Sequence, residues 1–158
     1  RKKLDAYLEE RISSANEKKT FSAILMDMDH FKTINDTYGH ESGDDALQIC
    51  VKLLRKSLRS KDFIARYGGD EFFIVLDTSD PPALEGIVSR IYDCIESYNE
   101  SGAQSYRLSF SIGYAVYDSY SGMQAEEFKN LLDKKMYEDK QSKKEKERDY
   151  CALEAVSD

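Results

Sequence analysis

The stretch FSAILMDMDH, residues 21–30, decides the fold because it is almost continuously apolar until it reaches acidic residues. An apolar run of this kind is typical of a central strand that is covered on both faces. We therefore predict a buried strand over residues 21–28. Asp27 and Asp29 stand at its end and His30 follows, so acidic side chains terminate a buried strand.

A second decisive stretch contains two β-rich runs, FIARY at residues 63–67 and DEFFIVL at residues 70–76. Only Gly68 and Gly69 separate these runs, which predicts a β-hairpin whose two-residue turn uses the positive φ that glycine supplies. The tip of this hairpin carries Asp70. A glycine turn also lets a ligand approach the backbone closely.

Apolar periodicity predicts helices in the rest of the chain, with proline at the start of one of them. The expected helices span residues 1–18, 44–59, 83–98 and 124–143. Alternating apolar residues predict a strand over 106–117, loosened at Gly113, and the end of the chain allows a short edge strand over 150–156. Strands that alternate with helices but include a hairpin indicate an α/β sandwich with a mixed or antiparallel sheet.

The overall composition excludes several classes of protein. The chain has 158 residues, of which 41% are hydrophobic, and this suits one domain with a real core. Because 30 acidic residues outnumber 23 basic ones, we expect no binding to polymeric nucleic acid. Three cysteines without CxxC spacing suggest neither a disulfide framework nor a zinc site. No apolar run is long enough to span a bilayer, so we expect a cytoplasmic location and no membrane contact from this chain, with a membrane anchor in the full-length protein left open.

Asp27 and Asp70 are the first candidates for chemistry, because a buried strand end and a tight turn can bring two carboxylates together. Paired carboxylates attract a cation, and Mg²⁺ prefers oxygen ligands shared with substrate phosphates. Such ions stabilise the attacking and leaving oxygens of a displacement at phosphorus, so nucleotidyl transfer is the natural chemistry. Alternatively, the carboxylates cap a helix or lie solvated at a strand end. The chain contains neither a GxxxxGK[ST] loop nor a strand-linked GxGxxG motif.

Phosphate groups need another binding element in such a chain. The backbone amides of His30, Phe31 and Lys32, where a strand turns into a helix, provide one candidate. The side chains of Lys32 and Lys140 would add positive charge. The alternative for each lysine is a solvated surface position, which is the usual place for this residue.

Two long motifs, RYGGDEF at residues 66–72 and MDMDHFKTINDTYGHESGDDAL at residues 26–47, resemble the GGDEF family of diguanylate cyclases. A looser likeness extends to DKKMYEDK at residues 133–140, so the resemblance covers nearly the whole chain as one domain, 1–158. It implies a central, mostly antiparallel five-stranded sheet wrapped by helices, similar to the palm of nucleotide cyclases and polymerases. It also implies an enzyme that joins two GTP molecules into cyclic di-GMP.

The resemblance assigns the metal and the catalytic groups. Asp27 and Asp70 match the carboxylates that bind Mg²⁺, with Mn²⁺ as an alternative ion, and the Met28 carbonyl is a further ligand. Glu71 matches the residue that supports the metal and helps to activate the attacking 3′-hydroxyl group. Lys32, together with Asp70 and Glu71, belongs to the implied catalytic set.

The resemblance also assigns the substrate site. Its implied members are His30, Phe31, Lys32, Asn35, Asp44, Gly68, Gly69, Lys140 and Lys144. Asn35 and Asp44 match positions that recognise guanine, since a carboxylate accepts from the guanine N–H donors and an amide offers complementary bonds. Lys144 stands where the family usually has arginine, so charge is kept but bidentate geometry is lost.

The resemblance further implies a homodimer, since each domain holds one GTP and two domains must meet face to face. Arg59 and Asp62 match the family's RxxD product-inhibition motif, with five residues between Asp62 and Gly68. Arg90 is a secondary candidate there. Arginine suits this task because its guanidinium group binds phosphate and stacks on guanine.

One departure concerns the start of the chain, where the family's DxLTGLxNR motif is missing except for its last arginine, at Arg1. We therefore expect a catalytic fragment from the C-terminal part of a longer signalling protein. Two other functions remain open from the sequence. One is a binding module that senses GTP or cyclic di-GMP without making it, and the other is a different magnesium-dependent nucleotidyl transferase.

Overall fold

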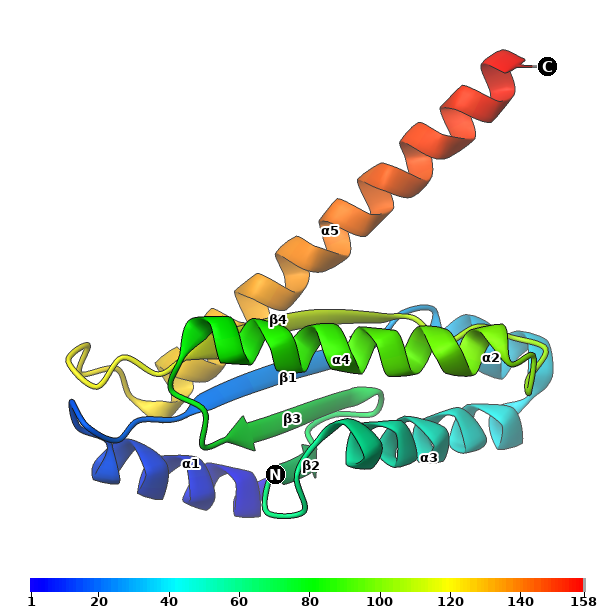
Figure 1. The fold of residues 1–158 in the computed structure, drawn as a ribbon. Coiled ribbons are helices and arrows are strands. Elements are labelled where there is room, and N and C mark those ends of the chain that lie inside the picture. The colour runs from blue at the N-terminus through cyan, green and yellow to red at the C-terminus, as the bar shows by residue number, and fades with distance from the viewer. Residues whose placement is uncertain (158) are drawn as a thin grey trace.

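The computed structural model describes residues 1–157, which form a sheet with helices on both faces (Figure 1). In chain order the elements are α1 (Lys2–Ser14), β1 (Ser22–Met28), α2 (Phe31–Tyr38), α3 (His40–Ser57), β2 (Phe63–Arg66), β3 (Glu71–Leu76), α4 (Pro81–Glu100), β4 (Phe110–Val116) and α5 (Ala125–Ser157). The predicted α/β sandwich is therefore confirmed. Over these residues the sheet has four strands instead of the five expected.

Strand β1 lies inside the sheet, in which the strand order is β2-β3-β1-β4 and every pairing is antiparallel. All seven residues of β1 are buried, which confirms the predicted central strand. The register places Asp27 opposite Glu71 on β3 and opposite Ser111 on β4. The acidic end of β1 therefore lies beside the hairpin.

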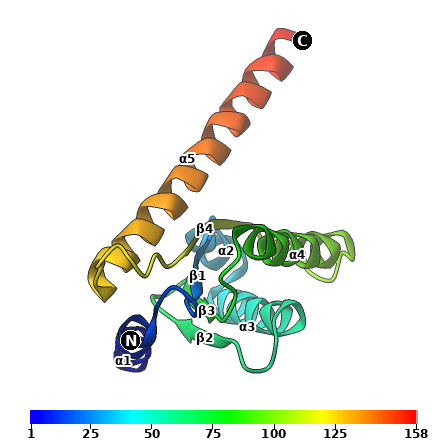
Figure 2. The ribbon, with the colours of Figure 1, turned by 60° about the vertical axis from the view of Figure 1, so that its left-hand side comes forward.

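The core is divided in two because successive side chains of a strand point to opposite faces of the sheet. Ile24 and Met26 pack in a cluster with α3 and α4, whereas Ala23 and Leu25 pack in a cluster with α1 and α5. Figure 2 shows α3 and α4 on one side of the sheet and α1 with the start of α5 on the other. By the same alternation, Asp27 faces the α5 side.

The hairpin between β2 and β3 is confirmed, but its turn differs from the prediction. The strand pairing ends at Arg66, and residues 67–70 form a four-residue connection. Neither Gly68 nor Gly69 has a positive φ, so the predicted two-residue turn is wrong. A longer connection reverses the chain without the left-handed backbone that a two-residue turn requires.

Helix α3 begins at His40, earlier than the predicted start near Asp44. Gly43 does not break this helix but lies buried within it. A Cβ atom on Gly43 would lie only 1.8 Å from Oδ1 of Asn35 on α2. The absent side chain of Gly43 therefore makes room for Asn35 between the two helices.

Helix α5 is longer than predicted. The predicted end near residue 143 and the edge strand over 150–156 are both wrong, because one helix runs from Ala125 to Ser157. Residues of high helix propensity, mainly lysine, glutamate and alanine, make up 11 of the 18 residues after residue 140, and no glycine or proline interrupts them. The residues of α5 that are buried are Phe128, Lys129, Leu132 and Met136. The C-terminal part of the helix projects away from the sheet (Figures 1 and 2).

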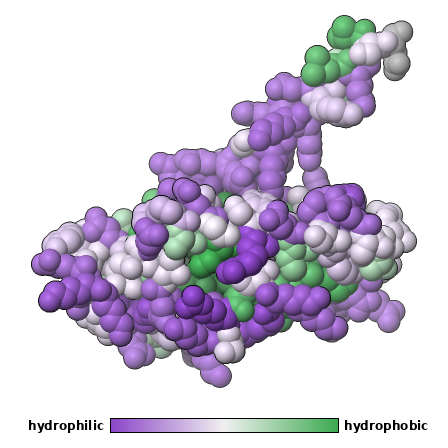
Figure 3. Space-filling view, in the orientation of Figure 1, coloured by the Kyte–Doolittle hydropathy of each residue, from purple (hydrophilic) through white to green (hydrophobic). Residues whose placement is uncertain are grey.

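The projecting part of α5 is hydrophilic along most of its length and hydrophobic near its end (Figure 3). The exposed apolar side chains there are Tyr150, Leu153 and Val156. None of the helices within residues 1–157 combines the length and the apolar composition that a membrane span requires.

Helix α5 crosses β4 at Gly113. A Cβ atom on this glycine would lie 2.3 Å from the carbonyl oxygen of Leu132 and 2.5 Å from the amide nitrogen of Met136. Gly113 pairs regularly with Leu25, so the predicted loosening of the strand is wrong. Its role is to let the backbone of α5 lie directly on the sheet.

We predict that Gly113→Ala lowers the free energy of unfolding by about 1–3 kcal/mol, because the added methyl group overlaps backbone that cannot yield cheaply. Urea denaturation measures this change. Gly86→Ala is a matched control, since Gly86 lies within α4 with no atom near its missing side chain. That control should gain roughly 0.5–1 kcal/mol from helix propensity. Equal effects of the two substitutions would contradict the close-contact argument.

Candidate active site

The centre of the candidate site is Asp27, at the end of β1, with Asp70 in the β2–β3 connection beside it. The backbone N–H of Met28 donates to the Asp70 carbonyl at 3.0 Å, which fixes the connection against the end of β1. The carboxyl group of Asp27 lies close enough for its negative charge to raise the pKa of Asp70. The structure therefore brings together the two carboxylates that the sequence singled out.

Asp27 is a buried residue, with 8% of its surface exposed. Its Oδ2 atom accepts a hydrogen bond from Nζ of Lys140 on α5 at 2.8 Å, which forms an ion pair. Its Oδ1 atom is the single buried side-chain polar atom in residues 1–157 that has no hydrogen-bond partner. Buried polar atoms are normally satisfied, so this oxygen is a strong candidate for a metal ligand.

The charges in this cluster are unbalanced. Burial raises the pKa of Asp70, and the nearby carboxylate of Asp27 raises it further. Burial also raises the pKa of Glu71, with repulsion from Asp27 and Asp70 adding to the effect. The hydrogen bond to Asp27 raises the pKa of Lys140, which therefore stays charged. An added cation would relieve the remaining repulsion.

These donors fit a hard divalent cation. Asp27 offers an unsatisfied oxygen, Asp70 offers a second carboxylate, and the Met28 carbonyl stands at the same strand end. In the described residues, no group of three or more His, Cys, Asp or Glu side chains is arranged to hold a metal. This donor set suits Mg²⁺, which is typically bound by one or two carboxylates with substrate phosphates and water.

A pocket of about 170 Å³ lies next to this cluster and is lined by three lysines. Its lining residues are Asp29, His30, Lys140, Lys143, Lys144 and Glu147. His30 has a left-handed backbone, with φ of 59°, and precedes the first turn of α2. The predicted residues Lys140 and Lys144 therefore share one pocket with the start of α2. Phe31 is partly buried against the core, and Lys32 is exposed on the first turn of α2.

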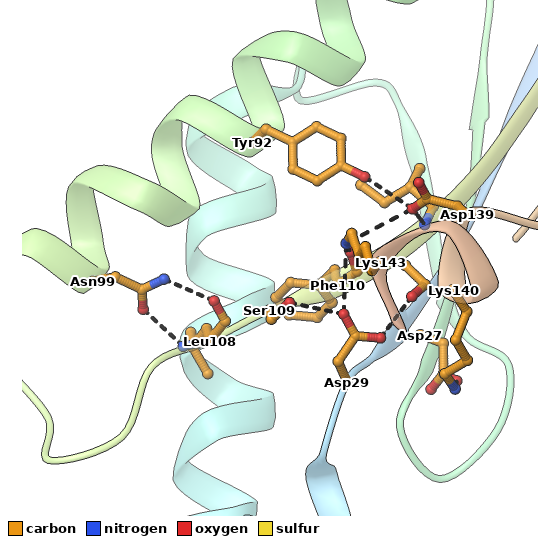
Figure 4. Close-up of polar contacts among 12 residues, drawn as sticks. Asp27, Asp29, Tyr92, Asn99, Leu108, Ser109, Phe110, Asp139, Lys140 and Lys143 are labelled. Carbon is orange, nitrogen blue, oxygen red and sulfur yellow. Dashed lines mark hydrogen bonds and ion pairs between the residues drawn. The ribbon is translucent and has the colours of Figure 1, made fainter. Parts of the chain in front are cut away.

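Lys143, which the sequence analysis missed, belongs to a polar network beside this pocket (Figure 4). Its Nζ atom lies 3.5 Å from Asp29 and 3.7 Å from Asp139, and it also donates to the carbonyl of Phe110. Asp139 in turn accepts from the hydroxyl group of Tyr92 at 3.2 Å. The spacing of three residues from Lys140 on one helix was the signal that could have identified Lys143.

Asp29 is held from two directions. The hydroxyl groups of Ser109 and Ser111 donate to its two carboxylate oxygens at 2.8 and 2.6 Å. Its backbone N–H donates to the Ser109 carbonyl at 2.8 Å. Asp29 therefore joins the end of β1 to the start of β4, next to Lys143.

A second pocket, of about 340 Å³, lies on the other side of the hairpin. It is lined by Asp44, Leu47, Gln48, Val51, Arg55, Ile64, Arg66 and Phe72. Asp44 is the predicted guanine-binding residue in this set, and Asn35 packs against the neighbouring Gly43. Arg66, which the sequence analysis did not assign, donates two hydrogen bonds to the Gly69 carbonyl, at 3.0 and 2.6 Å. It therefore stabilises the β2–β3 connection.

A third pocket, of about 260 Å³, contains all three residues of the expected inhibition site, Arg59, Asp62 and Arg90. The backbone N–H of Arg59 donates to the Asp62 carboxylate at 2.7 Å, and the N–H of Asp62 donates back to the Arg59 carbonyl. This closed turn leaves the Arg59 side chain exposed on the same surface as Arg90.

Known proteins resemble this chain in sequence. A family model described as diguanylate cyclase, GGDEF domain, matches residues 1–146. Diguanylate cyclase A of Treponema denticola is 34% identical over 131 residues, which cover 82% of this chain and 35% of that protein. The probable diguanylate cyclase DgcT of Escherichia coli is 34% identical over 139 residues, covering 85% of this chain and 30% of that protein.

Solved structures of GGDEF domains have the same fold as this chain. The isolated GGDEF domain of YfiN from Pseudomonas aeruginosa superposes with a TM-score of 0.80 at 28% identity, covering 90% of this chain and 84% of that one. The GGDEF domain of DgcB from Caulobacter crescentus, in complex with c-di-GMP, also has a TM-score of 0.80, at 25% identity, covering 90% of this chain and 85% of that one.

The helix-covered antiparallel sheet with an acidic edge therefore defines an α/β sandwich domain of the type seen in these structures. The chain belongs to the GGDEF domain family of diguanylate cyclases. It spans about a third of the length of the two curated relatives.

We predict that Asp70→Asn stabilises the metal-free protein at pH 7 by up to about 1 kcal/mol, a modest gain because the site is partly solvated. The raised pKa of Asp70 means that its charged form costs stability, and this cost appears as pH rises above the ordinary aspartate value of 3.8. The gain should therefore vanish near about pH 3.5. Urea denaturation across pH measures it.

Asp77→Asn is the control for this prediction. Burial pushes the pKa of Asp77 up, but attraction from Arg11 and Lys61 outweighs it, and the pKa is lowered. Stability from this group is present above the ordinary aspartate pKa and lost as pH falls, so its removal should be destabilising at pH 7. A loss of stability in Asp70→Asn as well would mean that Asp70 supports the fold.

We predict that Lys140→Met tightens the binding of free Mn²⁺ about fivefold, because the ammonium group that competes for Asp27 is removed. The same variant should bind GTP more weakly, since its pocket loses a positive charge. Mn²⁺ paramagnetic relaxation and nucleotide titration measure the two effects separately. Weaker Mn²⁺ binding would instead show that Lys140 orients Asp27 for the metal.

Proposed function

We propose that this domain is a diguanylate cyclase, which condenses two GTP molecules into cyclic di-GMP and two pyrophosphates. The observation that carries the proposal is the buried Asp27 carboxylate, which faces Asp70 and Lys140 and keeps one oxygen unsatisfied. Membership of the GGDEF family and the likeness to a domain in complex with c-di-GMP support it.

Asp27, Asp70 and the Met28 carbonyl would hold Mg²⁺, or Mn²⁺ in its place. When bound, the ion supplies charge stabilisation to the phosphate oxygens and to the attacking 3′-oxygen. Glu71 lies next to Asp70, and its raised pKa makes it a stronger base for the proton of the 3′-hydroxyl group. Lys32 adds positive charge from the first turn of α2.

The pocket around Lys140 is suited to the terminal phosphates. The backbone amides of His30, Phe31 and Lys32 begin a helix, where the positive end of the helix dipole favours anions. Lys140 and Lys144 add charge from α5. Lys143 forms ion pairs with Asp29 and Asp139, and these pairs order this wall of the pocket.

The pocket around Asp44 is suited to guanine. The Asp44 carboxylate accepts hydrogen bonds from the N–H groups of guanine, and Asn35 offers a complementary amide. Adenine would leave these groups unpaired, which costs binding energy and gives selectivity for GTP. Gly68 and Gly69 carry no side chain that would obstruct a nucleotide beside the hairpin.

Each domain offers one such site, so the reaction needs a homodimer in which two sites face each other. Each 3′-oxygen forms a bond to the α-phosphorus of the opposite GTP, and the bond from that phosphorus to pyrophosphate breaks. The proton of the 3′-hydroxyl group passes to the carboxylate of Glu71, which acts as the general base. The product of both steps is the closed cyclic dinucleotide.

The pocket of Arg59, Asp62 and Arg90 would bind the product and inhibit the enzyme. Two guanidinium groups on one surface suit a dinucleotide, since arginine binds phosphate and stacks on guanine. In this proposal the chain, residues 1–158, is one GGDEF domain of a longer cytoplasmic signalling protein.

We predict that the wild-type domain at high concentration forms cyclic di-GMP from GTP and Mg²⁺, whereas Asp70→Asn lowers the rate by roughly 100-fold or more because a metal ligand is lost. Mass-resolved product analysis measures this. Asp93→Asn, an exposed acidic position on α4, is the matched control and should keep the wild-type rate. Arg59→Ala should retain the initial rate and accumulate more product.

Other outcomes point to different conclusions. GTP binding without product, even in an enforced dimer, would identify a binding module. A product made from ATP instead would identify another nucleotidyl transferase. An Arg59→Ala variant that reaches the same product level as wild type would refute the inhibition site alone.

A further inference from the structure

Tyr67 begins the connection that carries Asp70. Its backbone N–H donates to the Glu71 carbonyl at 2.8 Å. This is the last short backbone hydrogen bond between the two sides of the hairpin. The following N–H, of Gly68, reaches the same carbonyl only at 3.4 Å. The position of Asp70 therefore depends on how firmly Tyr67 is held.

The ring of Tyr67 is partly buried and lies between Arg1, which precedes α1, and Lys129 of α5. The Arg1 guanidinium group is 4.9 Å from the ring centroid and donates to the Tyr67 hydroxyl at 3.4 Å. Nζ of Lys129 on α5 is 5.9 Å from the same centroid, within the range of a cation–π contact. Phe73 of β3 packs against the ring at 5.9 Å.

Lys129 is unusually buried for a lysine, with 4% of its surface exposed. Its ammonium group pairs with Asp5 of α1 at 2.8 Å and with Glu126 at 2.6 Å. Burial lowers the pKa of Lys129, but the hydrogen bonds that it donates to these two carboxylates outweigh burial and keep the group charged. One buried charge therefore joins α1, α5 and the ring of Tyr67.

The contact between α1 and the sheet is firm at the same place. Leu4 and Leu8 of α1 are almost fully buried in the cluster that also contains Phe73 and Phe128. Asp5 follows Leu4, so the seating of these leucines determines whether its carboxylate reaches Lys129.

We propose that Tyr67 is a positioning residue for Asp70, and that Lys129 and Arg1 hold its ring so that the seating of α1 sets the place of the metal-binding carboxylate. This inference rests on the proposed cyclase function of that carboxylate. Tyr67 lines none of the three pockets described above, so its contribution passes through the backbone of residues 67–70.

The link to the metal site has a second part. The Asp70 carbonyl accepts the N–H of Met28, so movement of the connection breaks a hydrogen bond at the end of β1. The amides of Tyr67 and Met28 therefore report the position of Asp70 in the metal-free protein. The amide of Ile24, in the middle of β1, reports global unfolding instead.

Amide hydrogen exchange by NMR on the whole chain, without nucleotide or metal, tests this inference. In Lys129→Met and Tyr67→Leu, we expect exchange at the backbone amides of position 67 and of Met28 to become about tenfold faster. Tyr67→Phe keeps the ring between its cations and should stay within about twofold of wild type. Lys134→Met removes the same charge from an exposed position of α5 and should also match wild type.

Steady-state kinetics supply the second readout. In Lys129→Met we expect kcat to fall roughly 10-fold or more while KM for GTP stays within about twofold, because a carboxylate is displaced and the nucleotide pockets are intact. If Tyr67→Leu does not fold, Lys129→Met and Arg1→Ala carry the test.

Two outcomes separate the inference from the proposed function. If Lys129→Met speeds exchange at Ile24 as much as at Met28, the inference is overturned, since Lys129 would then be only structural. If the variants speed exchange at Met28 selectively but the wild-type chain makes no cyclic di-GMP, the proposed function is refuted and the positioning of Asp70 by Tyr67 stands.

Discussion

The site depends on one constraint, the presence of a carboxylate at the end of a strand that is buried on both faces. Removing a charge such as that of Asp27 from water is costly unless partners compensate for the lost hydration. Lys140 compensates through one oxygen, and the other oxygen remains without a partner. Asp70 and Glu71 increase the negative charge instead of reducing it. The fold thus maintains an electrostatic cost at the place where a cation would remove it, which is typical of a functional site.

Lys140 and Lys143 reach the acidic end of β1 only because α5 lies directly on the sheet. Gly113 permits the approach, since any side chain there would meet the helix backbone at Leu132 and Met136. One turn further along, Lys140 reaches Asp27, and Lys143 reaches Asp29. A strand glycine that contacts no ligand therefore determines where the positive charge of the site is placed.

The sequence predicted the features that depend on local pattern. The apolar run ending in Asp27 identified the central strand, and the two β-rich runs around Gly68 identified the hairpin. Both predictions succeeded because the residue types of a buried strand can be recognised directly in the sequence. The sequence did not reveal the shape of the connection, the packing role of Gly43 or the pairing of Lys143. These features depend on which segments of backbone approach each other in space, and a single sequence does not give the distances between them. The long α5 was missed because an apolar end was interpreted as a strand, although lysine, glutamate and alanine favour a continuing helix.

Helix α5 connects the separate parts of the site through its period. Lys129, Met136, Lys140 and Lys143 stand within about 40° of one direction around the helix axis, as expected at 3.6 residues per turn. The same face therefore meets α1 and Tyr67 first, then the sheet at Gly113, and then the carboxylates. Because a helix is stiff along its axis, a change in how its first turns pack on α1 is carried to Lys140 as well as to Tyr67. Lys129, which contacts the ring of Tyr67, and Lys140, which pairs with Asp27, thus share one rigid support.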